Sequence, residues 1–349
     1  MRNRLRFWKY PIFIVMLLLV VAAFTLVYAL SDTAVAPYEH VETPEPVVNE
    51  TPEPPDTTVV SDAPDEPEVE PEEEEPFLYP ADVGYVTINM DISDIHRGYL
   101  ILVNYNHEYS IPDDLDLVNI IEARTTSFRV QSESFRLARS IMKPLDEMMD
   151  AFISTTRINS VSIISAFRNY DYQQRVLNNY IARVGRREAL RWASLPGHSE
   201  HHTGLAFDFG IISGGVRSTF TGTGSTSWFR QNSYNYGFIL RFPQNKTHIT
   251  RTSYEPWHYR FVGLPHSYIM FQNNWCFEEY IELLRDYTFE EPFEAEFDDV
   301  LYEIYFSDDT EIKLPLNSEF DISGNNVDGF IITIVRQEYD PSEVIDVSI

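Results

Sequence analysis

Residues 199–208 of this chain read SEHHTGLAFD, and residues 255–258 read EPWH. Together the two stretches supply His201, Asp208 and His258, which are two imidazoles and one carboxylate. A catalytic zinc site uses three such ligands and keeps a fourth position open for water. The pattern therefore predicts a metal centre assembled from two distant segments. Zinc is the ion these ligand types favour, although the aspartate leaves room for other divalent ions.

Gly204 lies between the first two candidate ligands, where a tight turn would bring a loop histidine and a strand aspartate to one point. Glu255 precedes His258 by three residues, so its carboxylate can face the water without binding the metal. As a general base it would take a proton during attack on a peptide carbonyl and pass that proton to the leaving amine. Arg168 follows a predicted buried strand and is the candidate that stabilises the oxyanion.

Apolar spacing and breaker residues predict a mixed order of helices and strands around these motifs. We expect helices over residues 132–152, 171–184, 186–193, 227–236 and 265–287, and strands over residues 161–165, 205–209, 238–242 and 257–262. Pro144 should kink or break the first helix, and Asp171 with Gln174 resembles a capping box at the start of the second. This order favours an α+β fold, in which a small mixed or antiparallel sheet flanked by helices carries the metal site.

Residues 290–349 differ in composition from the segment before them. They contain seventeen acidic and two basic residues, with a predicted hairpin over residues 300–314 and a strand over residues 330–335. We expect a small acidic β appendage there, after a metal-site domain over residues 81–289. The whole chain has a net charge of −28, but the metal-site domain itself is nearly neutral. A near-neutral domain with acidic flanks argues against nucleic acid as a partner.

The N-terminal region predicts export from the cytoplasm. Residues 11–30 carry no charge and are long enough to span a bilayer as a helix, and the basic residues before them should stay in the cytoplasm. We expect a cytoplasmic tip and signal anchor over residues 1–30, with cleavage after the Ala-Val-Ala at residues 34–36 as the alternative. Residues 31–80 hold eleven prolines and sixteen acidic residues without Lys or Arg, which is typical of a disordered tether. The single cysteine, Cys276, excludes an intrachain disulfide.

These motifs resemble those of the zinc D-alanyl-D-alanine carboxypeptidase and dipeptidase family that includes VanY and VanX. The resemblance is carried first by S-x-H-x-x-G-x-A-x-D over residues 199–208 and E-x-x-H over residues 255–258. Further similarity to the VanY-type branch lies in SAFR at residues 165–168, PGHSEH at residues 196–201, YGF at residues 236–238 and EPWHY at residues 255–259. It covers roughly residues 90–287 and implies one zinc ion per chain.

The resemblance also implies a role for each candidate residue. The implied zinc ligands are His201, Asp208 and His258. The implied catalytic residues are Glu255, as the general base, and Arg168, as the arginine that stabilises the transition state. The implied substrate-pocket residues are Ser199, Gln174 and Trp257.

The family trims stem peptides of bacterial cell-wall precursors, so the resemblance implies a zinc D,D-carboxypeptidase that acts on peptidoglycan stems ending in D-Ala-D-Ala. With the predicted anchor, the enzyme would be a single-pass protein of the bacterial cell membrane with its catalytic domain outside. Signal cleavage would instead yield a secreted form. Two functional alternatives stay open: an L,D-carboxypeptidase of tetrapeptide stems and, from another class, a non-catalytic wall-binding scaffold. A dipeptidase for free D-Ala-D-Ala fits less well, because such an enzyme is more useful in the cytoplasm.

Overall fold

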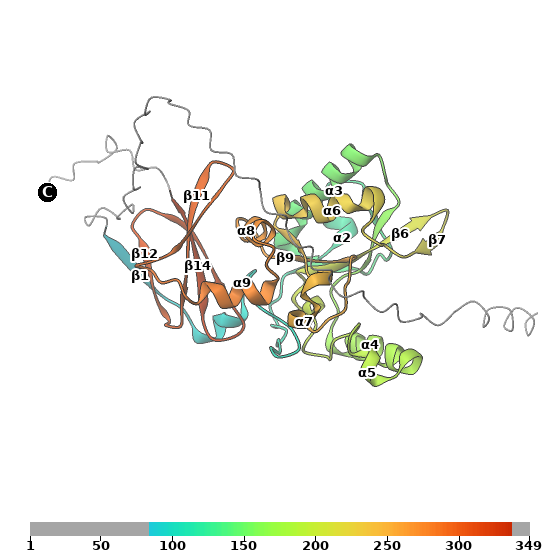
Figure 1. Cartoon of the computed structure of the whole chain (residues 1–349), viewed down its shortest axis with the longest axis horizontal. Helices are drawn as coiled ribbons and strands as arrows, with labels where there is room; N and C mark the ends of the chain where they lie inside the picture. The colour runs from blue at the N-terminus through green and yellow to red at the C-terminus, as the bar shows by residue number, and fades with distance from the viewer. Residues whose placement is uncertain (1–83, 337–349) are drawn as a thin grey trace, which may run out of the picture. The chain divides into compact units, whose positions relative to one another are not determined.

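The computed structural model of this chain describes residues 84–336 (Figure 1). The predicted signal anchor over residues 1–30 and the predicted tether over residues 31–80 lie outside the described residues. Within residues 84–336, no helix combines the length and the apolar character that crossing a membrane requires. The described part combines helices with small sheets, and the predicted α+β class is confirmed.

The sheet that carries the candidate ligands has the strand order β3-β5-β6-β9-β8, with β7 paired to β6. Its strands are β3 (Arg129–Val130), β5 (Val161–Ser165), β6 (Ala206–Ser213), β7 (Val216–Ser218), β8 (Phe238–Leu240) and β9 (His258–Phe261). Only the pair of β3 and β5 is parallel in this sheet. The strand predicted over residues 161–165 is confirmed over its whole length, and the other three predicted strands are confirmed with shifted ends.

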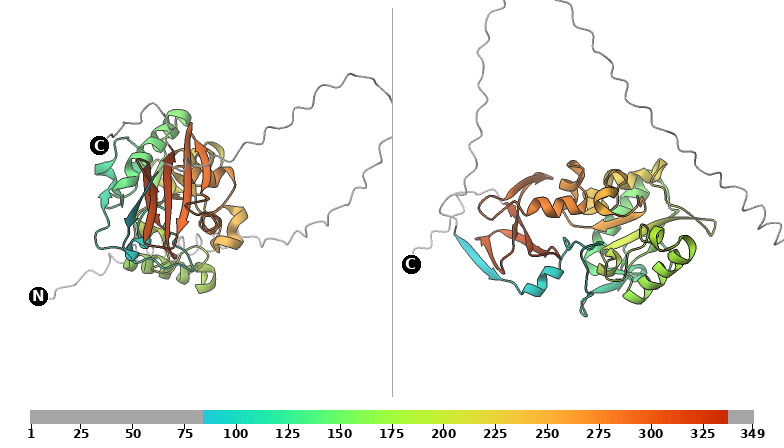
Figure 2. Two further views of the ribbon diagram at one scale, coloured as in Figure 1. Left: turned by 90° about the vertical axis from the view of Figure 1, so that its left-hand side faces the viewer. Right: turned by 60° about the horizontal axis from the view of Figure 1, so that its bottom comes forward.

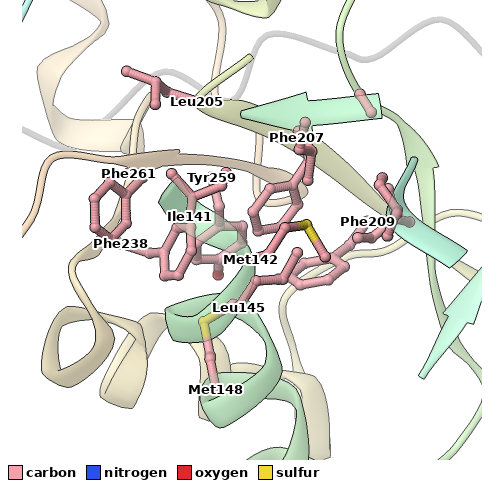
Figure 3. Close-up of a cluster of buried hydrophobic side chains, with 14 of the residues drawn as sticks. Ile141, Met142, Leu145, Met148, Leu205, Phe207, Phe209, Phe238, Tyr259 and Phe261 are labelled. Atoms are coloured by element: carbon pink, nitrogen blue, oxygen red, sulfur yellow. The ribbon is translucent and has the colours of Figure 1, made fainter. Parts of the chain in front are cut away.

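One helix, α3 (Met142–Thr156), packs against this sheet and fills much of its core. Its apolar residues recur at three- and four-residue spacing, which places them on one face of the helix. Figure 3 shows this face meeting aromatic side chains from β6, β8 and β9. The buried side chains include Met142, Leu145, Met148, Phe207, Phe209, Phe238 and Tyr259.

The start of α3 differs from the prediction of a helix over residues 132–152. The strand β4 (Arg136–Ala138) comes first and pairs with β2 (Leu117–Asn119), and the 3₁₀ turn η2 (Arg139–Ile141) follows. Pro144 lies in the first turn of α3, where its missing N–H group breaks no helical hydrogen bond. Pro144 therefore causes no kink, and of the two predicted outcomes the break is the one observed, since the regular helix begins two residues before it.

The other helices lie around the metal-site sheet or beside the C-terminal strands (Figure 1). They are α2 (Ile120–Ala123), α4 (Tyr170–Val184), α5 (Arg186–Ala189), α6 (Ser227–Asn232), α7 (Thr247–Thr250), α8 (His266–Gln272) and α9 (Phe277–Leu284), with the 3₁₀ turns η1 (Ile92–His96), η3 (Glu200–Thr203), η4 (Gly224–Thr226), η5 (Ser233–Tyr236) and η6 (Gln244–Lys246). The N-cap of α4 is Asn169, whose side chain accepts a hydrogen bond from Tyr172 N. The predicted capping box of Asp171 and Gln174 is therefore wrong.

The helix predicted over residues 265–287 is two helices, α8 and α9. Between them Asn274 adopts a left-handed backbone conformation with φ of 53°. Cys276 then acts as the N-cap of α9 in a capping box with Glu279. The apolar spacing continues across this short break, so periodicity alone did not reveal it.

A second sheet follows α9, with the antiparallel strand order β10-β11-β14-β13. Its strands are β10 (Phe293–Phe297), β11 (Val300–Ser307), β13 (Glu319–Gly324) and β14 (Phe330–Arg336). The intervening strand β12 (Glu311–Pro315) pairs instead with β1 (Tyr85–Asn89), which Figure 2 shows beside the C-terminal strands. The predicted hairpin over residues 300–314 is therefore wrong, because its two strands exist but do not pair.

Apolar side chains pack across the predicted domain boundary at residue 290. One buried cluster joins Leu102 of an extended arm, Ile239 of β8 and Tyr280 of α9 with Ile304 and Ile331 of the C-terminal sheet. The C-terminal sheet is thus in contact with the metal-site region through α9 and the arm. The boundary itself stays a prediction.

Candidate metal centre

His201, Asp208 and His258 come together at one point of the sheet. His201 lies in η3, Asp208 lies on β6, and His258 is the first residue of β9. Although Asp208 and His258 are fifty positions apart in the sequence, they lie directly opposite each other in the antiparallel pair of β6 and β9. Each of the three side chains offers one ligand atom within 4.8 Å of the other two. One metal ion could therefore bind all three side chains.

Gly204 sets the position of His201 relative to β6. It ends η3 in a left-handed conformation with φ of 71°, which glycine adopts without steric cost. A Cβ atom there would lie 3.0 Å from the backbone N of Ala138 and 2.7 Å from Leu117 Cδ2. A larger residue would therefore push the turn away from β4, and the predicted tight turn at Gly204 is confirmed.

Hydrogen bonds fix which ring nitrogen each histidine turns toward the centre. His201 Nδ1 donates to Ala166 O at 2.7 Å, which leaves its Nε2 at 3.4 Å from Asp208 Oδ2. That buried Nε2 has no hydrogen-bond partner among the described residues. His258 turns Nε2 toward Glu200 Oε2 at 3.3 Å and Nδ1 toward Asp208 Oδ1 at 2.9 Å. Nε2 of His201 thus lies beside a carboxylate and a second imidazole, and a residue outside the ligand set holds each ring. This arrangement fits a zinc site.

The local electrostatics also suit a divalent cation. Burial, with Arg168 nearby, lowers the pKa of His201 to about 4, so its imidazole is neutral at physiological pH. Burial opposes ionisation of Asp208, yet the two histidines hold the pKa of its carboxyl well below the usual value. Burial also opposes protonation of His258, but hydrogen bonds to Asp208 and Glu200 raise its pKa to about 9. A cation would displace that proton, because a ligating imidazole must be neutral.

Glu255 and Arg168 line the same pocket as the three candidate ligands, and its volume is about 510 Å³. Glu255 is buried in the loop before β9, and its backbone carbonyl accepts a hydrogen bond from His258 N at 3.1 Å. Burial raises the pKa of its carboxyl to about 8. Arg168 follows β5, and its backbone N donates to His201 O at 3.0 Å. Its buried Nε has no hydrogen-bond partner within residues 84–336.

The three residues predicted to line a substrate pocket have different positions. Ser199 is buried and lines the pocket. Trp257 also lines it, with its ring stacked on that of Trp192 at 6.3 Å between centroids. Gln174 instead lies on the exposed face of α4, where its Nε2 donates to Asn178 Oδ1 at 2.9 Å. The structure therefore brings Ser199 and Trp257 to the pocket but does not bring Gln174 there.

Sequence reasoning missed a buried group of charged residues beside the ligands. Glu200 faces His258 on one side, and the fully buried Arg241 and Arg260 on the other. A signal for them was present, because each arginine interrupts a predicted apolar strand. A charge at such a position requires a buried partner of opposite sign.

Known proteins share this arrangement of sequence and fold. A family model described as VanY, D-alanyl-D-alanine carboxypeptidase, matches residues 134–264. A D-alanyl-D-alanine carboxypeptidase of Enterococcus faecium is 31% identical over 246 residues, which cover 69% of this chain and 76% of the relative. The chain belongs to the VanY family. The predicted resemblance is confirmed, and the protein is a zinc metallopeptidase.

Two solved structures place this VanY-family enzyme among its relatives. The vancomycin-resistance D,D-dipeptidase VanXYg, in complex with a D-Ala-D-Ala phosphinate analogue, has a TM-score of 0.65 and 31% identity, and the match covers 72% of this chain and all 100% of that chain. The D,D-pentapeptidase VanY from a VanB-type cassette, in complex with Zn(II), is 31% identical over 52% of this chain and 98% of that chain, with a TM-score of 0.42. Membership of this zinc metallopeptidase family and the triad of candidate ligands confirm zinc as the cofactor, and the alternative of a non-catalytic scaffold loses its support.

Proposed function

We propose that this VanY-family enzyme is a D,D-carboxypeptidase that removes the terminal D-Ala from peptidoglycan stem peptides ending in D-Ala-D-Ala. The observation that supports this proposal most is the convergence of His201, Asp208 and His258 in one pocket with Glu255 and Arg168. The printed activity of the Enterococcus faecium relative supports the substrate. So does the D-Ala-D-Ala analogue bound by the structural relative VanXYg.

The proposed zinc ligands are His201 through Nε2, Asp208 through its carboxylate and His258 through Nδ1. These atoms are the ones that the hydrogen bonds to Ala166 and Glu200 leave facing one another. When bound, zinc supplies Lewis-acid polarisation of the scissile carbonyl and a water molecule of lowered pKa.

Glu255 and Arg168 are proposed to carry the proton and the charge of the reaction. Glu255 accepts the proton of the attacking water while the new C–O bond forms. It returns that proton to the amine nitrogen of the departing D-Ala as the C–N bond breaks. Arg168 offers an unpartnered Nε–H to the scissile carbonyl oxygen as negative charge develops there.

The remaining pocket wall suits a short peptide. Ser199 offers a hydroxyl group, and the stacked rings of Trp257 and Trp192 offer apolar surface beside it. Pockets that bind small ligands commonly combine a few polar groups with such apolar walls. We therefore keep Ser199 and Trp257 as proposed substrate contacts and leave Gln174 out.

Digestion of defined stem peptides by the full-length chain tests this function. A pentapeptide stem ending in D-Ala-D-Ala should lose one D-alanine, and a zinc chelator should stop the release. A tetrapeptide stem, assayed in parallel by mass spectrometry, should be cleaved far more slowly. Cleavage of the tetrapeptide alone would identify an L,D-carboxypeptidase, and no metal-dependent release from either peptide would contradict the proposal.

We also propose that residues 11–30 anchor the enzyme in the bacterial cell membrane with its catalytic domain outside. The uncharged length of this segment and the basic residues before it support that orientation. Cell fractionation should then recover the full-length chain with membranes, and protease added to spheroplasts should digest the catalytic domain. Recovery of a shortened chain from the medium would favour signal cleavage instead.

A further inference from the structure

Glu200 lies between the candidate ligands and the two buried arginines. Its Oε2 is 3.3 Å from His258 Nε2. Its Oε1 accepts hydrogen bonds from Arg241 Nε at 2.7 Å and from Arg260 Nη1 at 3.2 Å. Since a carboxylate can only accept, His258 donates from Nε2 to Glu200 and from Nδ1 to Asp208. Loss of the Nδ1 proton to a metal would leave Nε2–H as the donor to Glu200.

Arg241 connects Glu200 to a helix outside the metal-site sheet. Its two terminal nitrogens donate to the Glu278 carboxylate at 2.8 and 2.7 Å, which is a bidentate pair. Glu278 lies in the first turn of α9. The guanidinium group is also packed against the rings of Phe242 and Phe277, at 4.8 and 5.4 Å from their centroids. These contacts hold the Arg241 guanidinium group between two carboxylates and two aromatic rings.

Glu278 is held in turn by the pocket wall and the second core. Asn104, which lines the pocket, donates from Nδ2 to Glu278 Oε1 at 3.1 Å. The apolar face of α9 packs in the cluster that contains Ile304 and Ile331 of the C-terminal sheet. The Glu278 carboxylate is therefore held in place and can in turn hold the Arg241 guanidinium group.

The charges in this group balance and stay out of water. Two carboxylates, Glu200 and Glu278, face two guanidinium groups, Arg241 and Arg260. A buried ionic group of this kind adds little stability compared with apolar residues of the same volume. Hydrogen bonds to the rear nitrogen of a ligating histidine, however, fix the orientation of the ring and strengthen metal binding. The position of the group beside His258 therefore points to orientation rather than to stability.

We propose that Arg241 and Glu278 are positioning residues for the metal centre. They hold the Glu200 carboxylate against the Nε2–H group of His258, and thereby keep Nδ1 of that ring turned toward Asp208 and the zinc. This role rests on the proposed ligand set. It assigns a function to the contact between α9 and the metal-site sheet, and through α9 to the C-terminal sheet.

Zinc affinity measured on the full-length chain tests this role without any need for activity. The zinc dissociation constant would be determined by competition with a chromophoric chelator for the wild type and for Glu278→Gln and Arg241→Met. We expect about 10- to 100-fold weaker binding in both variants, with partial recovery in Glu278→Asp, which restores the charge. Glu282→Gln is the matched control, because Glu282 lies on the same helix and its side chain is 81% exposed.

Thermal unfolding of the zinc-free proteins separates positioning from a merely structural role. Zinc affinity lost by Glu278→Gln while the zinc-free protein unfolds at the wild-type temperature supports the proposal. Unchanged zinc affinity in Glu278→Gln overturns it even if Arg241→Met fails to fold. The proposal is also overturned if Glu278→Gln and the control Glu282→Gln weaken zinc binding by the same factor. A wild type that binds zinc but releases no D-alanine would contradict only the proposed substrate.

Discussion

Two buried histidines have opposite surroundings, one packed against the C-terminal sheet and the other at the metal centre. His266 begins α8, and both of its ring nitrogens have partners, Tyr280 OH at 2.8 Å and Thr333 Oγ1 at 3.0 Å. His201 uses one nitrogen for Ala166 O and leaves the other unpartnered among the described residues. Burial lowers the pKa of both, to about 3 and about 4. Burial and charge state are thus alike, but His266 has no ring nitrogen left for an ion, whereas Nε2 of His201 lies beside the Asp208 carboxylate and can bind one.

The same contrast extends to other polar groups of the two regions. Near the C-terminal sheet, Asn326 accepts a hydrogen bond from the His96 ring and donates to the carbonyl groups of Leu102 and Glu108. Near the metal centre, the buried Nε of Arg168 has no partner within residues 84–336. Asn326 thus fixes backbone carbonyl groups, whereas Arg168 keeps an N–H group available for a substrate.

The substitution His201→Ala should have the largest effect. It removes the nitrogen that this comparison identifies as a ligand, so we expect loss of zinc and a fall of D-alanine release to the level of the chelator-treated enzyme. Metal analysis of the purified variant together with the pentapeptide assay would measure both. If His201→Ala kept one zinc ion per chain, His201 would not be a ligand, and its unpartnered nitrogen would not distinguish it from His266.

Glu255→Gln should separate chemistry from metal binding. The amide keeps the shape of the carboxyl group but cannot take up the proton, so kcat should fall by about 10²- to 10⁴-fold. Zinc content should stay at the wild-type level, because Glu255 is not a proposed ligand. A variant with wild-type kcat would show that another group is the general base.

Arg168→Ala should lower kcat by about 10²- to 10³-fold, which is the usual loss for one donor to a developing oxyanion. The substitution removes the unpartnered Nε without removing a proposed ligand, so zinc affinity should change little. Arg168→Lys, which keeps the charge but loses the planar donor group, should retain an intermediate rate. Equal kcat values for wild type and Arg168→Ala would assign Arg168 a structural role.

His266→Phe should have the smallest effect on activity. It leaves the buried hydroxyl groups of Tyr280 and Thr333 without their partner, so we expect a loss of about 1–3 kcal/mol in the free energy of unfolding. Urea denaturation of the zinc-free protein would measure that loss. Because His266 binds only protein groups, zinc affinity and kcat should stay within about twofold of the wild type. A large fall in either quantity would contradict the comparison.

Local signals in the sequence predicted the parts of the site that lie within one element. The strand over residues 161–165 and the turn at Gly204 follow from short-range apolar pattern and glycine chemistry. The convergence of Asp208 with His258 depends on the pairing of β6 with β9, and spacing alone does not specify which strands pair. For that step the motif combination and its resemblance to a family were needed.

Other features depend on partners that are distant in the sequence. The pairing of β12 with β1 joins segments more than two hundred residues apart, and neither strand identifies the other. Gln174 matched a motif position, yet α4 turns it outward and buries the adjacent Gln173, which donates to Ser194 O. The link from Glu200 to α9 was hidden for the same reason. The two arginines that bind Glu200 interrupt predicted strands and so indicate buried partners, but the sequence does not say which carboxylates those partners are.

The cross-strand pair of Asp208 and His258 has a practical consequence. A slip of one residue between β6 and β9 would turn one of the two side chains to the opposite face of the sheet. Chains that assemble this sheet wrongly could not hold the ion at all. The metal content of a purified sample therefore reports the fraction of molecules with correctly assembled strands, and it can serve as a quality control for recombinant batches before any substrate is added.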